Sequence, residues 1–156
     1  MRVIFLDFDG VLHPLGLVLQ KGRTIRGKPV ARPTSISLFC WLPLLARLLA
    51  AHDDVRLVVH SSWRSAHSEQ QLRTFLGPLA DRFVGATDDV LSKAPSIGAW
   101  LQDHPSVVSY RVLDDALQES DGGQLVGSLI RCDSGLGLSE ATVQAQLRAW
   151  LEATSS

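Results

Sequence analysis

Short apolar runs alternate along the chain with longer segments in which apolar residues recur every three or four positions. The clearest run is Arg2–Leu6, followed by 55–60 and 107–113, with weaker runs at 82–84 and 124–130. Short runs rich in valine, leucine, isoleucine and phenylalanine are typical of buried strands. The pattern therefore predicts five strands.

Four further segments have the spacing of amphipathic helices. They are a helix over about 42–51, a helix that Ser65 caps, a helix that follows Lys93, and a last helix that Ser139 caps. Strands alternating with helices of this length favour a mostly parallel sheet covered on both faces. We therefore expect an α/β fold, a Rossmann-like three-layer sandwich with a mostly parallel five-stranded sheet.

Residues 13–36 show neither pattern and contain three prolines. Val18–Leu19 and Thr24–Ile25 flank a turn signal in this segment and predict a small hairpin. A chain of 156 residues is of the usual size for one domain, so we expect a single domain over 1–156.

Composition excludes some classes of partner. The 15 basic and 16 acidic residues give a net charge of -1, so the chain has no overall attraction to nucleic acid or to anionic membranes. No stretch approaches about 18 uninterrupted apolar residues, the length a membrane-spanning helix needs. The N-terminal apolar run is broken at Asp7, which does not fit a signal peptide. We expect a cytoplasmic protein without membrane contact.

Polar residues gather where the predicted strands end or the next helices begin. They are Asp7, Asp9, Ser61, Ser62, Lys93, Asp114 and Asp115. Because the carboxyl ends of parallel strands share one edge of the sheet, these residues should lie close together. Clustered carboxylates repel one another, and a hard cation such as Mg²⁺ relieves that repulsion. A lysine and a hydroxyl beside such a metal suit a phosphoryl group.

The order of these residues resembles the four motifs of the haloacid dehalogenase (HAD) superfamily. The sequence Asp-Phe-Asp-Gly-Val-Leu at 7–12 looks like motif one in the DxDG form that its phosphatases use. Val-Val-His-Ser-Ser at 58–62 resembles motif two, Lys93 resembles motif three, and Val-Leu-Asp-Asp at 112–115 resembles motif four.

Two further segments narrow the resemblance. Residues 131–138 and the Ser-Ser-Trp-Arg run at 61–64 are similar to the small HAD domains grouped with RNA-repair proteins.

The resemblance implies a magnesium-dependent phosphatase and gives each residue a role. Asp7 would attack phosphorus and form an aspartyl-phosphate, and Asp9 would act as general acid and then general base. Magnesium would be held by Asp7, the backbone carbonyl of Asp9 and the acidic pair, with Asp115 preferred over Asp114 as the direct ligand.

The remaining residues of the predicted site would bind the phosphate of the substrate. Ser61, or Ser62 if the strand ends one residue later, would donate a hydrogen bond to it, and Lys93 would neutralise its charge. Arg64 would either contact a substrate phosphate or pair on the surface.

The spacing of the motifs leaves no room for a cap domain, so the resemblance implies the capless type with residues 13–36 as a flap. An open site favours a bulky phosphorylated substrate such as a nucleic-acid end. The alternative is a nucleotide or another small phosphorylated metabolite.

Two other classes of function remain open from the residues. A phosphoacceptor signalling domain also combines clustered Asp, Ser or Thr, and Lys on a parallel sheet. A non-catalytic phosphate-binding domain would need fewer of these residues than the chain carries. The five histidines show no metal-ligand spacing and are expected to be structural or on the surface, whereas Trp63 is a candidate for stacking on a substrate.

Overall fold

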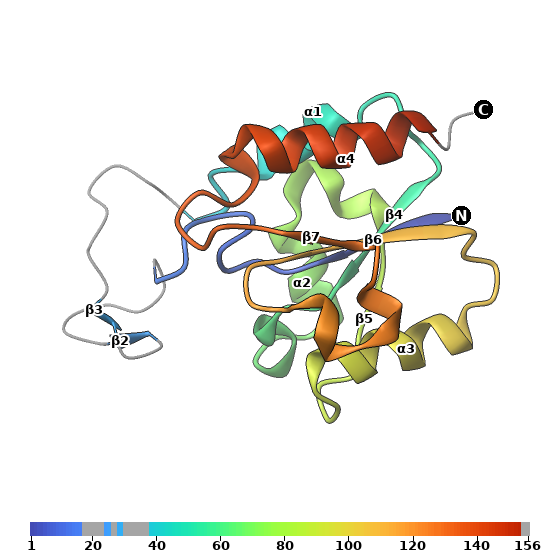
Figure 1. Cartoon of the computed structure of the whole chain (residues 1–156), viewed down its shortest axis with the longest axis horizontal. Helices are drawn as coiled ribbons and strands as arrows, with labels where there is room; N and C mark the ends of the chain where they lie inside the picture. The colour runs from blue at the N-terminus through green and yellow to red at the C-terminus, as the bar shows by residue number, and fades with distance from the viewer. Residues whose placement is uncertain (17–23, 26–27, 30–37, 154–156) are drawn as a thin grey trace.

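Five parallel strands form the central sheet of the computed structural model, which describes residues 1–16, 24–25, 28–29 and 38–153. The strand order is β5-β4-β1-β6-β7, and every pairing in this sheet is parallel (Figure 1). The strands are β1 (Arg2–Leu6), β4 (Val55–Val59), β5 (Phe83–Ala86), β6 (Ser109–Asp114) and β7 (Leu129–Arg131). The predicted five-stranded parallel sheet is confirmed.

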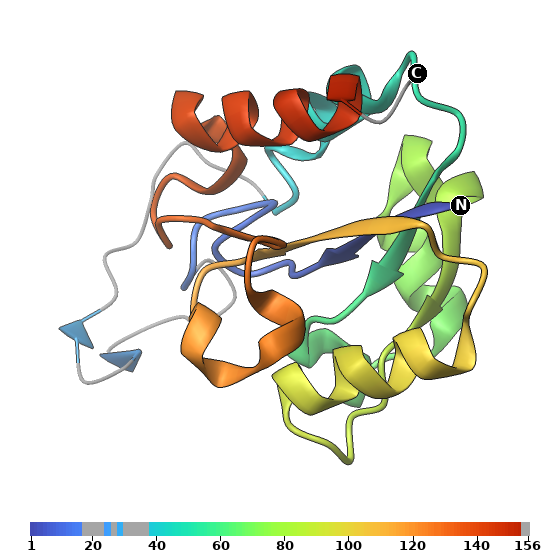
Figure 2. The same cartoon turned by 45° about the vertical axis from the view of Figure 1, so that its right-hand side comes forward.

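Helices cover both faces of this sheet. They are α1 (Leu42–Leu49), α2 (Glu69–Phe75), α3 (Lys93–Asp103) and α4 (Ala141–Ala153). Figure 2 shows α1 and α4 on one side of the sheet and α3 on the other. Apolar residues of α2 share a core cluster with those of α1 and α4, so three helices pack on one face. The three-layer arrangement is therefore also as predicted.

The central strand β1 separates two hydrophobic cores. Ile4 and Leu6 point into the core beneath α1, α2 and α4, while Val3 and Phe5 point into the core beneath α3. All five residues of β1 are buried. Residues 3–6 are apolar, as expected of a strand that alternates between two buried faces, and the charge of Arg2 is paired with Asp54 at 2.6 Å.

Backbone hydrogen bonds continue the sheet beyond the strand ends. The amide of Asp7 donates to the carbonyl of Leu113, and the amide of His60 donates to the carbonyl of Leu6. Cys132 likewise donates to the carbonyl of Asp114. The chain therefore leaves β1, β4, β6 and β7 at one common edge, and their first loop residues lie side by side.

Two predicted helix caps are wrong. Ser68, not Ser65, caps α2, because Ser68 and Gln71 form a reciprocal capping box, while Ser65 ends a 3-10 turn over Ser62–Ser65. Helix α4 begins at Ala141, and Ser139 belongs to a preceding 3-10 turn in which its hydroxyl donates to the carbonyl of Leu136.

The last predicted strand is also shorter than expected. Gly123–Leu125 form a 3-10 turn, and Gly127 has a positive φ of 72°. The strand that joins the sheet is therefore Leu129–Arg131, which begins five residues later than the predicted strand 124–130 and ends one residue after it. Leu125 is buried in the core beneath α3, so an apolar run that resembles a strand is here a turn that fills the core.

A small antiparallel hairpin pairs β2 (Thr24–Ile25) with β3 (Lys28–Pro29). The predicted partner Val18–Leu19 and most of the predicted flap lie outside the described residues. In the part of the chain that the structure describes, no helix has the length and apolar character needed to cross a membrane.

Candidate active site

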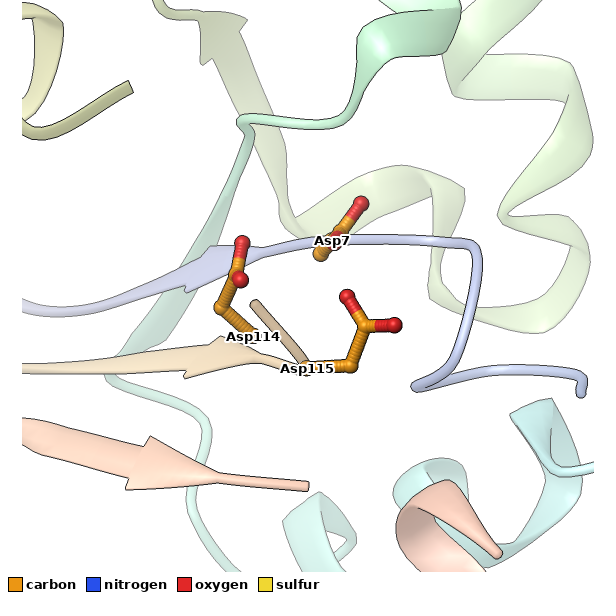
Figure 3. A group of neighbouring side chains, drawn as sticks. All are labelled: Asp7, Asp114 and Asp115. Atoms are coloured by element: carbon orange, nitrogen blue, oxygen red, sulfur yellow. The ribbon is translucent and has the colours of Figure 1, made fainter. Parts of the chain in front are cut away.

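Asp7, Asp114 and Asp115 converge at the carboxyl edge of the sheet (Figure 3). Asp7 follows β1 and Asp114 ends β6, two neighbouring strands in which Leu6 pairs with Leu113. All three residues are buried, and one oxygen from each lies within 4.8 Å of the others. Among the described residues, this is the group with the spacing to hold a metal ion.

The electrostatics of Asp7 fit a cation site. Burial raises the pKa of Asp7 well above its usual range; Lys93 opposes this shift, and the nearby Asp114 and Asp115 add to it. A buried carboxylate among like charges is costly to ionise, and a divalent cation between the carboxylates removes that cost. Three oxygen donors suit a hard ion such as Mg²⁺.

Lys93 links the carboxylates from the first turn of α3. Its Nζ lies 3.0 Å from Oδ2 of Asp7 and 2.7 Å from Oδ2 of Asp114. Burial disfavours the ammonium ion, but the two carboxylates outweigh burial and raise the pKa of Lys93. Lys93 is therefore a cation beside Asp7.

Asp114 is fully engaged by the protein. Besides Lys93, Nε2 of His60 lies 3.0 Å from its Oδ2, and the amides of Ala116 and Leu117 donate to its Oδ1 at 2.7 and 2.8 Å. Burial acts to raise the pKa of Asp114, but the hydrogen bonds from His60 and Lys93 lower it below its usual range. Asp114 is thus a carboxylate that holds Lys93 in place.

Asp115 lies closer to the loops that surround the site. Its Oδ2 accepts a hydrogen bond of 2.8 Å from the hydroxyl of Ser134. Gly10, which has a φ of 77°, packs against the Asp115 side chain so closely that any Cβ at position 10 would overlap the carboxylate. The glycine of the DxDG motif is required both for its left-handed backbone and for this contact.

Asp9 is placed apart from the three converging carboxylates. Its Oδ1 lies 2.7 Å from Nε2 of His13, and its Oδ2 accepts from Nε1 of Trp63 at 3.1 Å. The turn after β1 brings Asp9 and His13 together, because the amide of Gly10 donates to the carbonyl of His13, whereas Trp63 comes from the 3-10 turn after β4. The Asp9 side chain retains 23 % exposure, so one side of it faces solvent.

The serines and the arginine after β4 have different positions. Ser61 is fully buried, and its Oγ accepts from the amide of Trp63 at 3.2 Å, which leaves the hydroxyl proton able to donate. Ser62 is exposed. Arg64 donates to the carbonyls of His60, Ser61 and Asp88, so it braces the loop.

One known family matches almost the whole chain. Residues 3–143 match the HAD domain in Swiss Army Knife RNA repair proteins. This chain belongs to that HAD family. Comparison with curated proteins and with solved structures gave no match. Membership of the HAD superfamily favours phosphatase-type chemistry and accounts for the order of the four motifs.

Sequence reasoning missed several residues of this HAD domain. His13 and His60, expected to be structural or on the surface, are both fully buried and contact Asp9 and Asp114. The spacing of four residues between Asp9 and His13 and the position of His60 at the end of β4 were the available signals. No sequence pattern links Ser134 to Asp115.

Trp63, the candidate for stacking on a substrate, packs within a cluster of aromatic rings. Its ring contacts Phe8, His13, Phe39, His67 and Phe75 at centroid distances from 5.2 to 5.7 Å. His67 already stacks on the indole at an interplanar angle of 24°. The indole is therefore a packed part of this HAD domain that points its N–H at Asp9.

Proposed function

We propose that this protein is a magnesium-dependent phosphatase that hydrolyses phosphomonoesters through an aspartyl-phosphate on Asp7. The observation that supports it most is the arrangement around Asp7, whose Oδ2 lies 3.0 Å from Nζ of Lys93 in a buried group with Asp114 and Asp115. A nucleophilic carboxylate, a fixed cation and a cluster of oxygen donors for a metal are the parts that phosphoryl transfer needs.

The residues that would hold magnesium are Asp7, Asp115 and the backbone carbonyl of Asp9. Asp115 is the better ligand of the acidic pair, because Asp114 already accepts from Lys93, His60 and two backbone amides. A bound magnesium ion would neutralise phosphate oxygens and favour the ionised form of Asp7.

In the first step, a carboxylate oxygen of Asp7 attacks phosphorus while the bond from phosphorus to the ester oxygen breaks. Asp9 gives its proton to the departing oxygen, and Lys93 and the Ser61 hydroxyl bind the transferred phosphoryl group.

In the second step, water attacks the phosphorus of the aspartyl-phosphate and Asp9 takes a proton from that water. The bond between phosphorus and Asp7 breaks, inorganic phosphate leaves, and both aspartates return to their starting states. One ester and one water are consumed for each alcohol and phosphate formed.

A nucleic-acid end is the substrate class we favour. The support is the family description, which places such HAD domains in RNA repair proteins. The segment 13–36 carries five of the 15 basic residues of a chain whose net charge is -1. Most of this segment lies outside the described residues. A nucleotide or small phosphorylated metabolite is the alternative.

Hydrolysis of para-nitrophenyl phosphate by wild type and Asp7→Asn tests the reaction. The amide is a very poor nucleophile, so Asp7→Asn should retain less than about one per cent of the activity while keeping the circular dichroism and Tm of a folded protein. Activity should vanish in chelator and return with Mg²⁺, with calcium a poor substitute. Substantial turnover by Asp7→Asn would refute the nucleophile.

Incubation with para-nitrophenyl phosphate also distinguishes a phosphatase from the other two classes of function, a phosphoacceptor signalling domain and a non-catalytic phosphate-binding domain. A phosphoacceptor domain would accumulate phosphorylated protein with little turnover, and a binding domain would bind phosphate esters without hydrolysing them.

Substrate class is tested by comparing a phosphorylated oligonucleotide with the matching mononucleotide. We expect a higher kcat/KM for the oligonucleotide at low salt, with an advantage that shrinks as salt rises because phosphate contacts release counterions. Replacement of Arg23, Arg26 and Lys28 by Ala should remove this advantage and spare para-nitrophenyl phosphate hydrolysis. A better mononucleotide at low salt would favour the small-metabolite alternative.

A further inference from the structure

Both oxygens of the Asp9 carboxylate face a protein donor. His13 contributes Nε2 at 2.7 Å from Oδ1, and Trp63 contributes Nε1–H at 3.1 Å from Oδ2. The two donors come from different parts of the fold, the turn after β1 and the 3-10 turn after β4. Two hydrogen bonds on opposite oxygens fix the rotation of a short side chain that is otherwise free to turn about two bonds.

The tautomer of a neutral His13 ring follows from the hydrogen bond at its other nitrogen. The backbone amide of Phe39 donates to Nδ1 of His13 at 3.2 Å, so Nδ1 carries a lone pair. In a neutral imidazole the proton then sits on Nε2, which makes His13 a donor to Asp9. The ring has no exposed surface and packs edge-on against Phe39 at 5.1 Å, which holds its orientation.

Backbone strain at Phe39 supports a functional reason for this arrangement. Among the described residues, Phe39 is the one non-glycine residue with a positive φ, at 57°. A large side chain in this region is unfavourable, and such strain persists where the surroundings require it. Here the strained residue directs its amide to His13 and its ring against Trp63.

We propose that His13 and Trp63 are positioning residues for Asp9, holding its carboxyl group toward the leaving oxygen of the substrate. This inference rests on the proposed phosphatase function. Each carboxylate oxygen has two lone pairs, so a donor on one of them leaves the other able to carry the proton that Asp9 transfers. Proton transfer depends on geometry within a fraction of an ångström, so loss of either donor lowers the rate without touching the nucleophile.

Trp63→Phe is the first test, because it deletes the N–H and keeps an aromatic ring in the cluster. Turnover is measured on two esters. The leaving group of para-nitrophenyl phosphate departs with little help from a proton donor, whereas the alkoxide of benzyl phosphate must be protonated as it departs. We expect kcat/KM, which reports the steps up to release of the alcohol, to fall about tenfold on benzyl phosphate and less than about twofold on para-nitrophenyl phosphate. Equal losses on both substrates would overturn the role of Trp63.

A matched pair of variants tests His13. His13→Gln places an amide N–H near the position of Nε2, whereas His13→Asn is one methylene shorter and matches only the Nδ1 side. His13→Asn should lose on the order of ten- to a hundredfold in kcat/KM on benzyl phosphate, with a smaller loss on para-nitrophenyl phosphate. His13→Gln should recover most of that loss. If Asn and Gln are equally impaired on both esters, His13 is merely structural.

Phe75→Leu serves as the packing control. Phe75 contacts the Trp63 ring at 5.2 Å but takes no part in the hydrogen bonds to Asp9. Its effect on the two esters should be equal, with any loss matched by a lower Tm. A loss selective for benzyl phosphate in Phe75→Leu would mean that packing alone explains the other variants.

Asp9→Asn separates this inference from the proposed function. If wild type turns over neither ester, the proposed function fails. If Asp9→Asn shows the leaving-group-dependent loss and Trp63→Phe and His13→Asn do not, the function stands and the positioning role fails. In an Asp9→Asn background, adding Trp63→Phe should cause no further selective loss, because the two changes remove the same step.

Discussion

The loop at the end of β1 (residues 7–9) and the loop at the end of β6 (the last strand residue Asp114 and Asp115) each carry two carboxylates, and in each loop one of the two contacts a buried histidine. Asp9 contacts Nε2 of His13, and Asp114 contacts Nε2 of His60. Both rings have no exposed surface. The other carboxylate of each loop, Asp7 or Asp115, belongs with Asp114 to the group that can hold a metal.

The surroundings of the two held carboxylates differ. Asp114 has no exposed side chain surface and also accepts from the Lys93 ammonium, so its charge is neutralised inside the protein. Asp9 keeps 23 % of its side chain exposed and is held by two aromatic N–H donors. The same type of histidine contact thus occurs on a fully buried carboxylate in one loop and on a partly exposed carboxylate in the other.

Asp114 and Asp115 provide the largest expected contrast. Asp115→Asn should raise the Mg²⁺ concentration for half-maximal activity by at least about tenfold, because it weakens a direct ligand. Asp114→Asn should instead lower kcat by about ten- to a hundredfold through misplacement of Lys93, with less change in the magnesium requirement. Activity titrated with Mg²⁺ distinguishes the two.

The opposite outcome has a clear meaning. If Asp114→Asn shifts the magnesium requirement and Asp115→Asn does not, their roles are exchanged and the comparison between the two loops fails.

Gly10→Ala tests the contact between the loops. The added Cβ would overlap the Asp115 carboxylate, and the φ of 77° disfavours any side chain. The conformational part alone should cost about 1–2 kcal/mol of the free energy of unfolding, and the magnesium requirement should rise several-fold. Gly123→Ala is the control, since nothing lies within 4 Å of its added Cβ. Equal Tm values for the two variants would contradict the contact.

Ser134→Ala should have a smaller effect of the same kind. It removes a hydrogen bond of 2.8 Å to Oδ2 of Asp115, worth about 1 kcal/mol. We expect a rise of about threefold to tenfold in the Mg²⁺ concentration for half-maximal activity, with kcat at saturating metal nearly unchanged. Ser134→Thr, which retains the hydroxyl, should restore the wild-type requirement. A loss of kcat that magnesium cannot rescue would place Ser134 outside the metal site.

The pH dependence of stability gives the smallest predicted effect. Burial raises the pKa of Asp7, so the folded metal-free protein keeps this proton where the unfolded chain has lost it. Its stability should fall as pH rises from the ordinary carboxyl range through the raised pKa of Asp7. Magnesium needs the ionised carboxylate, so the gain in Tm on adding Mg²⁺ should be a few degrees larger at about pH 8 than at about pH 5.5.

Thermal scans with and without Mg²⁺ at the two pH values measure this difference. Asp7→Asn is the control, because its gain in Tm should vary less with pH. Equal gains for the wild-type protein at both values would contradict the titration of Asp7 in the site.

Local sequence determined the fold class and the edge at which the site lies. The run at Arg2–Leu6 is a central strand with all five residues buried, and its four apolar residues 3–6 fill the cores on both faces of the sheet. Since parallel strands end at a common edge, Asp7 and the pair Asp114 and Asp115 could be grouped from the sequence alone. Family membership over 3–143 agrees with this grouping.

Element ends were less predictable, because local signals compete. Ser65 and Ser68 both suit a helix cap, and the partner Gln71 decided for Ser68. The apolar run at 124–130 has the composition of a strand, but its glycines and the core position of Leu125 made most of it a turn.

Tertiary structure decided which side chains hold the predicted acids. Trp63 and His60 lie 54 residues from Asp9 and Asp114, and no periodicity or spacing connects positions so far apart. These contacts depend on where two loops meet in space and on the direction of each ring, which the packing of the whole core sets. The sequence therefore determined which carboxylates gather at the edge of the sheet, and the folded structure determined which donors of the protein each of them contacts.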